Sequence, residues 1–401
     1  MSPIEVPALP SPPALPGGWL ATPGTRAGVA AADVKGNGVE RDDVAILLAP
    51  GVAAGVTTTS TAAAASCHWT RARLPGPAQA VVVNAGNANA ATGQRGVDDN
   101  AAMAQAVADA LGCGVDGVLV CSTGVIGVPL PMDRLLPGIR RAAAGGTAAP
   151  DALARAILTT DLQPKQHAVR IGGITVGGIA KGSGMIHPGM ATMLAFLSTD
   201  ARIDPADLQE LTVAVCDQSF HAITVDGDQS TNDTFLVQAT GVGPAVRRGT
   251  PAWDDLRAGL LAVATHLARA IAADGEGATR LIECVVLGTG SDAAARAAAR
   301  AVLGSALVKS AIHGCDPNWG RVVGALGAAG VPDLDALDLD FAGVPVLRGG
   351  SPIAFDEARA SAALDHDEVQ IACRLPGPGL GRAWGCDLSA QYVRINADYR
   401  S

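Results

Sequence analysis

Short apolar runs of strand length alternate with alanine-rich segments of helical periodicity along most of this 401-residue chain. Residues 98–111 show the helical pattern, because Met103, Val107 and Leu111 recur every fourth residue. Three of the apolar runs are short enough to be strands: residues 45–48, 80–83 and 118–121. A chain that mixes strands with helices in this way predicts an α/β or α+β fold, in which sheets are covered by helices.

The second half of the chain continues this alternation. Pro205 and Pro251 each stand where a helix is expected to begin, since proline is tolerated in the first turn. After Pro251, apolar residues recur at steps of three or four, which is the helical period. We expect a strand over residues 281–287 and a helix over 292–303, with a domain junction near 288–291.

Chain length suggests two or three structural units, because a single hydrophobic core stops growing near ~250–300 residues. Residues 1–23 are rich in proline and predict an extended arm with little capacity to pack. They lack the basic and apolar regions of a signal peptide. The apolar stretch over residues 44–56 is interrupted by Pro50 and Gly51 and is too short to span a bilayer. We therefore expect no membrane anchor.

Charge and cysteine content exclude several classes of partner. The formal net charge is −9, and no lysine and arginine cluster forms a basic stripe, which argues against nucleic acid and anionic membranes. The eight cysteines form no C-x-x-C pair and no spacing typical of metal ligands. We therefore expect no metal and no disulfide framework, and the reducing cytoplasm as the location.

The most unusual segment is residues 181–200, which read K-G-S-G-M-I-H-P-G-M-A-T-M-L-A-F-L-S-T-D. The simplest interpretation is a glycine-rich loop that enters a buried strand over residues 192–197. A phosphate cradle at residues 182–184 is disfavoured, because the P-loop spacing and the helix that should follow it are absent. A third interpretation makes Thr192 a nucleophile, exposed by cleavage of the peptide bond before it.

The chemistry of threonine makes the third interpretation reasonable. A threonine hydroxyl is a poor nucleophile near neutral pH and needs an adjacent base. A freed α-amine has a reference pKa of about 7.7–8.0, against about 10.4 for lysine, so it takes the hydroxyl proton far better. The small Ala191 and the glycines upstream allow the strained backbone that cleavage of the bond before Thr192 requires.

Seven segments of the chain, in this order, resemble the motifs of one family. They are V-V-N-A-G-N-A-N-A-A-T-G (82–93), S-T-G-V-I-G (122–127), K-G-S-G-M-I-H-P-G-M-A-T-M-L (181–194), D-G-D-Q-S-T-N-D-T (226–234), D-G-E-G-A-T (274–279), D-P-N-W-G-R (316–321) and I-N-A-D-Y-R-S (395–401). From about residue 24 to its end, the chain resembles the ornithine acetyltransferase (glutamate N-acetyltransferase) family. The precursors of that family cleave themselves before a threonine in the third motif.

The resemblance implies that the chain cleaves itself between Ala191 and Thr192, into residues 1–191 and 192–401. Thr192 then becomes an N-terminal nucleophile with its own amine as general base. It accepts an acetyl group from N2-acetyl-L-ornithine and passes it to L-glutamate, in a ping-pong reaction of the cyclic route of arginine biosynthesis. Thr123 (hydroxyl) and Gly124 (backbone N–H) match the positions that stabilise the oxyanion.

Other residues match the substrate-binding positions of the family. Together with Thr192 they are Thr160, Lys181, Glu276, Asn396 and Ser401. A lysine suits the α-carboxylate of either amino acid, and a glutamate suits the cationic end of ornithine. Thr159 lies next to Thr160, so the position of the binding threonine is open by one residue.

The resemblance also implies a fold and an assembly. The fold is an aminopeptidase/ornithine-acetyltransferase-like α/β sandwich over residues 24–285, followed by a smaller C-terminal α/β domain over 286–401. The two processed chains stay together and form a heterotetramer with two copies of each. No cofactor is implied, because the threonine carries the acyl group, although acetyl-CoA could serve as a second acetyl donor.

Some positions depart from the family pattern. They are His187, Gly189, Gln229, Cys315 and residues 57–61. These differences leave substrate choice open and allow a paralogue of specialised metabolism that acylates another amino acid. Two further hypotheses remain: a self-processed amidase or aminopeptidase, in which water resolves the acyl-enzyme, and an uncleaved, inactive paralogue that only binds an amino acid.

Overall fold

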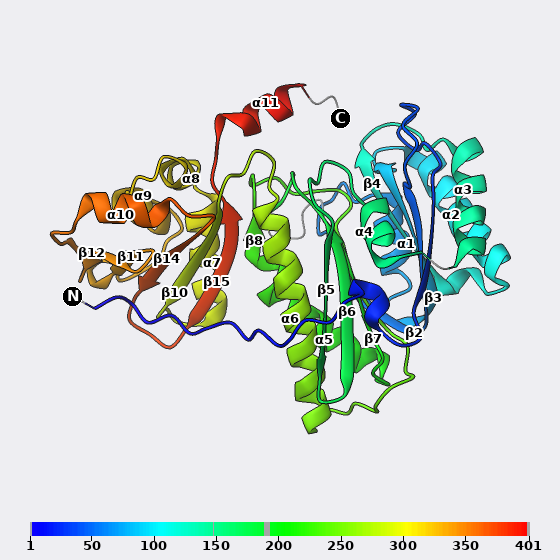
Figure 1. The fold of residues 1–401 in the computed structure, drawn as a ribbon, viewed down its shortest axis with the longest axis horizontal. Helices are drawn as coiled ribbons and strands as arrows, with labels where there is room; N and C mark the ends of the chain where they lie inside the picture. The colour runs from blue at the N-terminus through cyan, green and yellow to red at the C-terminus, as the bar shows by residue number, and fades with distance from the viewer. Residues whose placement is uncertain (1, 147, 188–192, 399–401) are drawn as a thin grey trace. The chain divides into compact units, whose positions relative to one another are not determined.

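The computed structural model describes residues 2–146, 148–187 and 193–398. The chain forms two compact units whose segments alternate along the sequence. The N-terminal unit contains residues 11–221 and 228–267, and the C-terminal unit contains residues 2–10, 222–227 and 268–398. Each unit has its own sheet with helices packed on it (Figure 1), so the expected α/β fold is confirmed.

The N-terminal unit is built on an eight-stranded sheet of order β4-β3-β2-β9-β7-β6-β5, with β1 paired to β2. The β3–β4 and β7–β9 pairs are parallel, and the remaining pairs are antiparallel. The strands are β1 (Arg26–Ala30), β2 (Val44–Thr57), β3 (Gly76–Asn87), β4 (Val118–Val125), β5 (Lys165–Ile171), β6 (Ile174–Lys181), β7 (Leu194–Thr199) and β9 (Thr234–Ala239).

The helices of this unit begin close to where the sequence predicts them. Two start at prolines, as expected, and the predicted helix over residues 98–111 starts five residues earlier, at Gly93. The helices are α1 (Ala65–Arg71), α2 (Gly93–Leu111), α3 (Met132–Gly145), α4 (Pro150–Ala156), α5 (Pro205–Gln218) and α6 (Pro251–Ala273). The end of α6 belongs to the C-terminal unit.

Two cores explain why the strands of this sheet read as continuous apolar runs. In β2, Val44 and Ile46 pack against α2 and α3, which lie on the same side of the sheet (Figure 1). The alternate residues Ala45 and Leu47 belong to a second core, which also contains side chains of β6, β7 and β9. The sheet therefore folds over and its two halves pack face to face, which gives the expected α/β sandwich.

Helix α6 covers the outer face of the second half of the sheet. Val263 and Leu267 pack over Gly178 of β6, where an added Cβ would lie within 3 Å of both side chains. By length and composition alone, α6 is the one helix in the described part of the chain that could cross a bilayer. Half of its most apolar window is buried, as in a core helix of a globular unit.

The proline-rich N-terminal segment packs more than its composition predicts. The side chain of Trp19 is fully buried in the core between the two halves of the sheet, and Ile4 is buried in the C-terminal unit. The backbone of Ala14 bridges to Val169 of β5. The expectation of little packing is therefore wrong. Trp19 lies in a short 3-10 helix over Gly18–Ala21, and burying a large apolar side chain is favourable even where most of the segment has no regular structure.

The C-terminal unit has a seven-stranded sheet of order β13-β12-β11-β14-β10-β15-β8. Its strands are β8 (Ile223–Thr224), β10 (Leu281–Leu287), β11 (Asp338–Phe341), β12 (Val344–Arg348), β13 (Ser351–Pro352), β14 (Glu368–Arg374) and β15 (Leu380–Cys386). The predicted strand over residues 281–287 is confirmed as β10. The expected domain boundary at residues 285/286 falls inside this strand.

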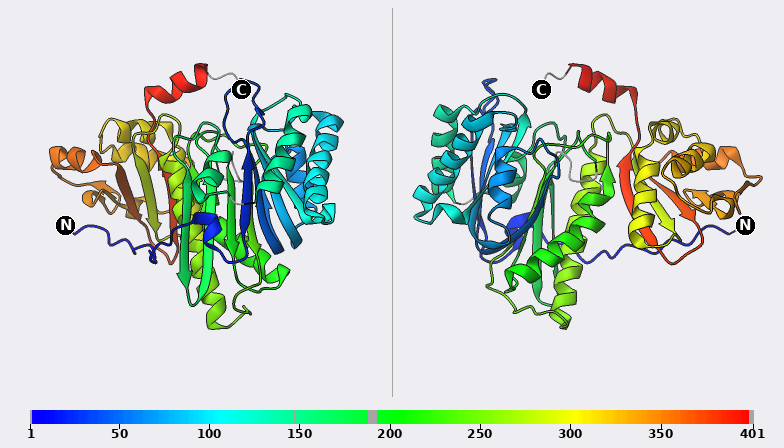
Figure 2. Two further views of the ribbon diagram at one scale, coloured as in Figure 1. Left: turned by 45° about the vertical axis from the view of Figure 1, so that its right-hand side comes forward. Right: turned by 180° about the vertical axis from the view of Figure 1, so that it is seen from behind.

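Helices α7 (Asp292–Gly304), α8 (Ala306–His313) and α9 (Trp319–Ala328) pack on this sheet around one core. The side chain of Ser291 caps α7 by accepting a hydrogen bond from the Ala294 N–H, which explains why the helix begins where predicted. The remaining helices are α10 (Glu357–Leu364) and α11 (Ala390–Asp398). None of the residues of α11 is buried, and the helix extends away from the sheet of its unit (Figure 2).

Candidate active site

The segment expected to carry the nucleophile connects β6 to β7, which pair antiparallel with Lys181 opposite Leu194. The structure describes this connection up to His187 and again from Met193. Other predicted positions lie outside the described residues: Gly189, Ala191, Thr192 and Ser401. The surroundings of the two strand ends, β6 and β7, therefore define the site.

Lys181 and Thr123 come from two different motifs and lie 58 residues apart in the sequence, but the fold brings them together. The Lys181 ammonium donates a hydrogen bond of 3.3 Å to the Thr123 hydroxyl oxygen. Both side chains are buried, at 1% exposure each. Lys181 ends β6 and Thr123 lies near the end of β4, so the contact bridges the two facing halves of the folded sheet.

This contact fixes how the Thr123 hydroxyl can be used. An ammonium group has three donors and no acceptor, so the hydroxyl oxygen must accept the bond. Its own hydrogen then remains for a further acceptor. A neighbouring positive charge at low local dielectric also makes the hydroxyl a stronger donor.

Gly124 follows Thr123 on β4 with a φ of +135°, a region that favours glycine. A Cβ placed there would lie 2.2 Å from the carbonyl carbon of Gly86 on the neighbouring β3. The pairing of β3 and β4 is irregular at this point, beside Asn87. A glycine is therefore required at the position where the resemblance implies an oxyanion-binding N–H.

Asp161 lies beside Lys181 and is fully buried at its side chain. It accepts hydrogen bonds from the Lys165 ammonium at 2.7 Å and from the Gly182 N–H at 2.6 Å, and the Lys181 ammonium is 3.9 Å away. Burial raises the pKa of Asp161, but Lys181, Lys165 and the Gly182 N–H lower it by more, to about 2. The carboxylate is therefore charged at neutral pH and compensates two buried ammonium groups.

Asp161 was not among the expected site residues. Its sequence signal is weak: one acid in the run L-T-T-D-L, directly after Thr159 and Thr160. The carboxylate also accepts the Thr159 N–H at 3.2 Å, which ties this short segment to Lys181. Both threonines are half-buried, so the choice between them as the binding residue stays open.

Glu276 and Asn396 lie in the C-terminal unit and contact each other. The Asn396 amide donates a hydrogen bond of 3.0 Å to a Glu276 carboxylate oxygen. The turn that carries Glu276 touches the start of α11, because the Ser389 hydroxyl donates to the Gly277 carbonyl at 2.6 Å. A Cβ on Gly277, whose φ is +72°, would lie 2.5 Å from the Tyr392 nitrogen. Two predicted substrate-binding residues are thus adjacent although 120 positions separate them.

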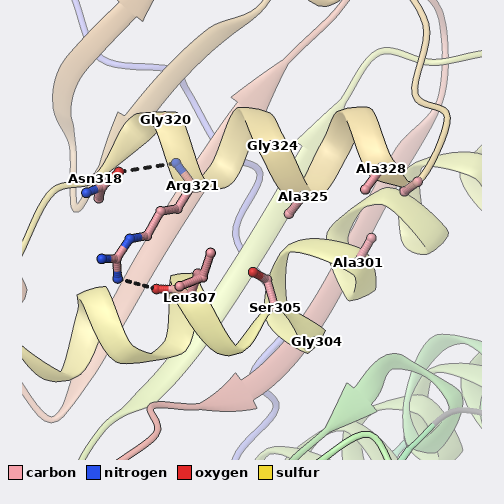
Figure 3. A pocket seen from close by; sticks show the side chains of 11 residues that line it. Ala301, Gly304, Ser305, Leu307, Asn318, Gly320, Arg321, Gly324, Ala325 and Ala328 are labelled. Carbon is pink, nitrogen blue, oxygen red and sulfur yellow. Dashed lines mark hydrogen bonds between the residues drawn. The ribbon is translucent and has the colours of Figure 1, made fainter.

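Two hollows in the C-terminal unit have no expected site residue in their lining. One, of about 740 Å³, is lined mostly by glycine and alanine of α7 and α9, and beside it the Arg321 guanidinium donates to the Leu307 carbonyl (Figure 3). The other, of about 520 Å³, lies at residues 314–320 and includes Cys315. Within the described ranges, no cluster of three or more His, Cys, Asp or Glu is placed to hold a metal ion.

The ArgJ family model matches residues 26–401 of the chain. An arginine biosynthesis bifunctional protein ArgJ from Symbiobacterium thermophilum is 50% identical over 403 residues, which cover 96% of this chain and 99% of that protein. The protein of the same name from Parasynechococcus marenigrum is 49% identical and covers 96% of this chain and 95% of its own length.

A solved structure agrees with these relatives. The crystal structure of an arginine biosynthesis bifunctional protein argJ from Bacillus halodurans is 43% identical and superposes with a TM-score of 0.51. It covers 52% of this chain and 100% of the Bacillus chain. The resemblance based on the seven motifs is thus confirmed by independent matches over nearly the whole sequence, and the chain belongs to the ArgJ family.

Proposed function

We propose that this protein is a self-processing acetyltransferase of arginine biosynthesis. It transfers the acetyl group of N2-acetyl-L-ornithine to L-glutamate through an acetyl ester on Thr192. The observation that carries the proposal is the 3.3 Å hydrogen bond from Lys181 to Thr123. It places a cation and a hydroxyl donor together beside the strand that begins two residues after Thr192.

Each half-reaction is balanced by residues of this chain. The Thr192 hydroxyl attacks the acetyl carbonyl carbon while the freed α-amine takes the hydroxyl proton. The C–N bond to ornithine then breaks, and the same proton goes to the leaving amine. In the second half-reaction the neutral amine of glutamate attacks the ester carbonyl carbon, and the α-amine of Thr192 takes a proton from the attacking nitrogen. The C–O bond to Thr192 then breaks, and the same proton restores the hydroxyl.

Each tetrahedral intermediate carries a negative oxygen. The Thr123 hydroxyl is suited to stabilise it, because Lys181 occupies its acceptor side and leaves its hydrogen for the oxyanion. The Gly124 N–H would supply the second donor. A single donor of this kind typically contributes about 2.7–4 kcal/mol to transition-state stabilisation.

The two ends of acetylornithine carry opposite charges, a carboxylate and a side-chain ammonium, so each needs a binding residue of the opposite sign. Lys181 can bind an α-carboxylate, and Glu276 can bind the side-chain ammonium of ornithine. The amide of Asn396 holds one carboxylate oxygen of Glu276 and leaves the other oxygen for such a cation. Thr160, or Thr159 beside it, and Ser401 complete the proposed substrate-binding set.

Processing at Ala191/Thr192 has support from chain lengths. The Bacillus halodurans chain is matched over its whole length by 52% of this chain. Fragment 192–401 is also about half of the sequence. A half-length chain is what cleavage at this bond would produce.

Acetyl-CoA is the proposed second acetyl donor, because the relatives from Symbiobacterium and Parasynechococcus are both named bifunctional. No resident cofactor or metal is required, since the threonine carries the acyl group and protein groups stabilise the oxyanion. The processed chains would assemble as a heterotetramer with two copies of each. We place the enzyme in the cytoplasm, where its eight cysteines, all free in the structure, would stay reduced.

Intact-mass measurement of the purified protein tests the proposal before any substrate is tried. The wild-type protein should give two fragments, residues 1–191 and 192–401, in place of the 40.0 kDa chain. Thr192→Ala should stay uncleaved and form no N-acetylglutamate. Turnover by the folded Thr192→Ala variant would refute the assigned nucleophile.

Assays with defined combinations of substrates separate the remaining hypotheses. Acetylornithine plus glutamate should give ornithine and N-acetylglutamate in equal amounts. Acetate release at the same rate with and without glutamate would identify a hydrolase instead. Acetyl-CoA plus glutamate, without acetylornithine, tests the second donor, and absence of product would remove it.

A further inference from the structure

Two adjacent buried residues, Asn232 and Asp233, lie directly before β9 in the N-terminal unit and have no role in the function proposed above. Their exposed fractions are 3% and 0%. Both use their side chains to hold backbone groups of distant segments. Burying a polar side chain costs free energy unless it is hydrogen-bonded, so we expect the hydrogen bonds of these two residues to serve the structure or the site.

Asp233 holds the residue that follows the proposed nucleophile. Its carboxyl oxygen Oδ1 accepts a hydrogen bond of 2.8 Å from the Met193 N–H. The Met193 carbonyl in turn accepts from the Thr234 N–H at 3.2 Å. The Met193 nitrogen is the atom bonded to Thr192 in the sequence, so Asp233 holds the chain directly after the proposed nucleophile.

Asn232 holds the strand that carries the proposed oxyanion donors. Its amide nitrogen donates to the Ser122 carbonyl at 2.9 Å and to the Ala88 carbonyl at 2.6 Å. Ser122 directly precedes Thr123. Ser122 lies within β4 and Ala88 directly follows β3, so one amide joins the two strands beside the close contact of Gly86 with Gly124.

The pair is itself held rigidly. The Thr231 hydroxyl donates to the Asn232 Oδ1 at 2.6 Å, and the Asn232 N–H donates to the Ser230 hydroxyl at 3.1 Å. The Asp233 carbonyl accepts from the Thr58 N–H at 2.9 Å. The two side chains therefore have little freedom to change partners.

The carboxyl group of Asp233 lies in an environment that disfavours a charge. Burial raises the pKa of Asp233 well above its usual range, although the Met193 N–H and the charge of Lys181 lower it. The second oxygen, Oδ2, is buried and has no hydrogen-bond partner among the described residues. An asparagine amide has the same shape and keeps an oxygen that can accept the Met193 N–H, so it is a close substitute for the hydrogen bond made by Oδ1.

We propose that Asn232 and Asp233 are positioning residues that fix the nucleophile and the oxyanion donors relative to each other. Asp233 sets the peptide group next to Thr192, and Asn232 sets the backbone next to Thr123. The inference rests on the proposed function and assigns it two further residues.

The test compares the rate of self-cleavage, and kcat after cleavage, in matched variants. Asp233→Asn keeps an oxygen that can accept the Met193 N–H. Asp233→Ala removes this acceptor, and Asp233→Ser leaves only a shorter side chain. Asn232→Ala removes the hydrogen bonds to the Ser122 and Ala88 carbonyls. Asp43→Asn is the control, because Asp43 is also a buried carboxyl, and it accepts the Ala32 and Val34 N–H groups at 2.7 Å each. Circular dichroism and thermal midpoints identify the folded variants.

We expect Asp233→Asn to cleave within about threefold of the wild-type rate and the two truncations to be at least tenfold slower. Asn232→Ala should slow cleavage, or lower kcat of the cleaved enzyme, by at least tenfold with KM within threefold. Asp43→Asn should lower the thermal midpoint but leave the cleavage rate unchanged. If Asp233 had only a structural role, Asp233→Ala and Asp233→Ser would show the same result as this control.

Two results would overturn the inference. One is cleavage and turnover within twofold of wild type in the folded truncations and in Asn232→Ala. The other is an Asp233→Asn variant that folds but cleaves as slowly as a truncation, since the role would then need the negative charge. A wild-type protein that neither cleaves nor turns over refutes the proposed function itself and is recognised before any variant is made.

Discussion

Replacing Asp161 with asparagine removes a buried negative charge that lies against the ammonium groups of Lys165 and Lys181. The side chains of all three residues are at most 2% exposed. An asparagine oxygen can still accept hydrogen bonds from Lys165 and from the Gly182 N–H, so shape and hydrogen bonding are largely preserved. The substitution therefore isolates the contribution of charge.

The size of the effect follows from the pKa of Asp161. It lies at about 2 in the folded protein, against an ordinary value of 3.8. At about 1.4 kcal/mol for each pKa unit, this difference corresponds to about 2–3 kcal/mol of stability at neutral pH. We expect Asp161→Asn to lower the free energy of unfolding by about 2–3 kcal/mol at pH 7.

The pH dependence has a defined sign. The folded-state pKa is lowered, so the contribution is complete above about pH 5 and is lost as the pH falls through about 2. At pH 3 about 1 kcal/mol of it should already be gone. The difference in the free energy of unfolding between wild-type Asp161 and Asp161→Asn should therefore decrease by about 1 kcal/mol between pH 7 and pH 3.

Urea unfolding followed by circular dichroism measures these differences, in a Thr192→Ala background so that one uncut chain unfolds. Asp151→Asn is the matched control. Asp151 also pairs with a cation four residues away at 2.7 Å, Arg155, but both side chains are more than half exposed. An exposed pair contributes about 0–1 kcal/mol, so this control should change little.

Equal destabilisation by Asp161→Asn and Asp151→Asn would refute the reasoning, because burial would then not determine the value of the charge. The reasoning would also be refuted if the difference in the free energy of unfolding between wild type and Asp161→Asn stayed constant from pH 7 to pH 3. In that case the effect would come from packing or hydrogen bonding and not from ionisation of the carboxylate.

Three further predictions concern the site and its surroundings. Thr123→Val should lower the acetyl-transfer rate by about 10²–10³ and Thr123→Ser should retain most of it, as measured by steady-state kinetics, because one oxyanion donor is lost or kept. Asn396→Ala should raise KM for acetylornithine several-fold with little change in kcat, since it frees the Glu276 carboxylate; an unchanged KM would contradict the proposed binding role. Burial and the stacked ring of His266, 3.9 Å away, lower the pKa of His167 to about 4, so stability should fall as the pH drops from about 6.5 towards 4. His167→Gln should reduce the fall in thermal midpoint between pH 7 and pH 5, and an equal fall in both proteins would contradict it.

The sequence alone determined the elements whose signals are local. The strand over residues 281–287 and the helices that begin at Pro205 and Pro251 follow from apolar spacing and cap residues within a few positions. The motif resemblance likewise identified Lys181 and Thr123 one by one. These features can be predicted from the sequence because each depends only on residues that are neighbours along the chain.

Only the tertiary structure decided which residues meet. Four strands separate β4 from β6 in the order of the sheet, and Lys181 reaches Thr123 only because the sheet folds over on a shared core. The same folding buries Asp161 and Asp233, and nothing in the residues next to them in the sequence indicates that burial. Hydrogen bonds between distant segments and the loss of solvent around a charge depend on the path of the whole chain, and no local pattern of residues encodes them.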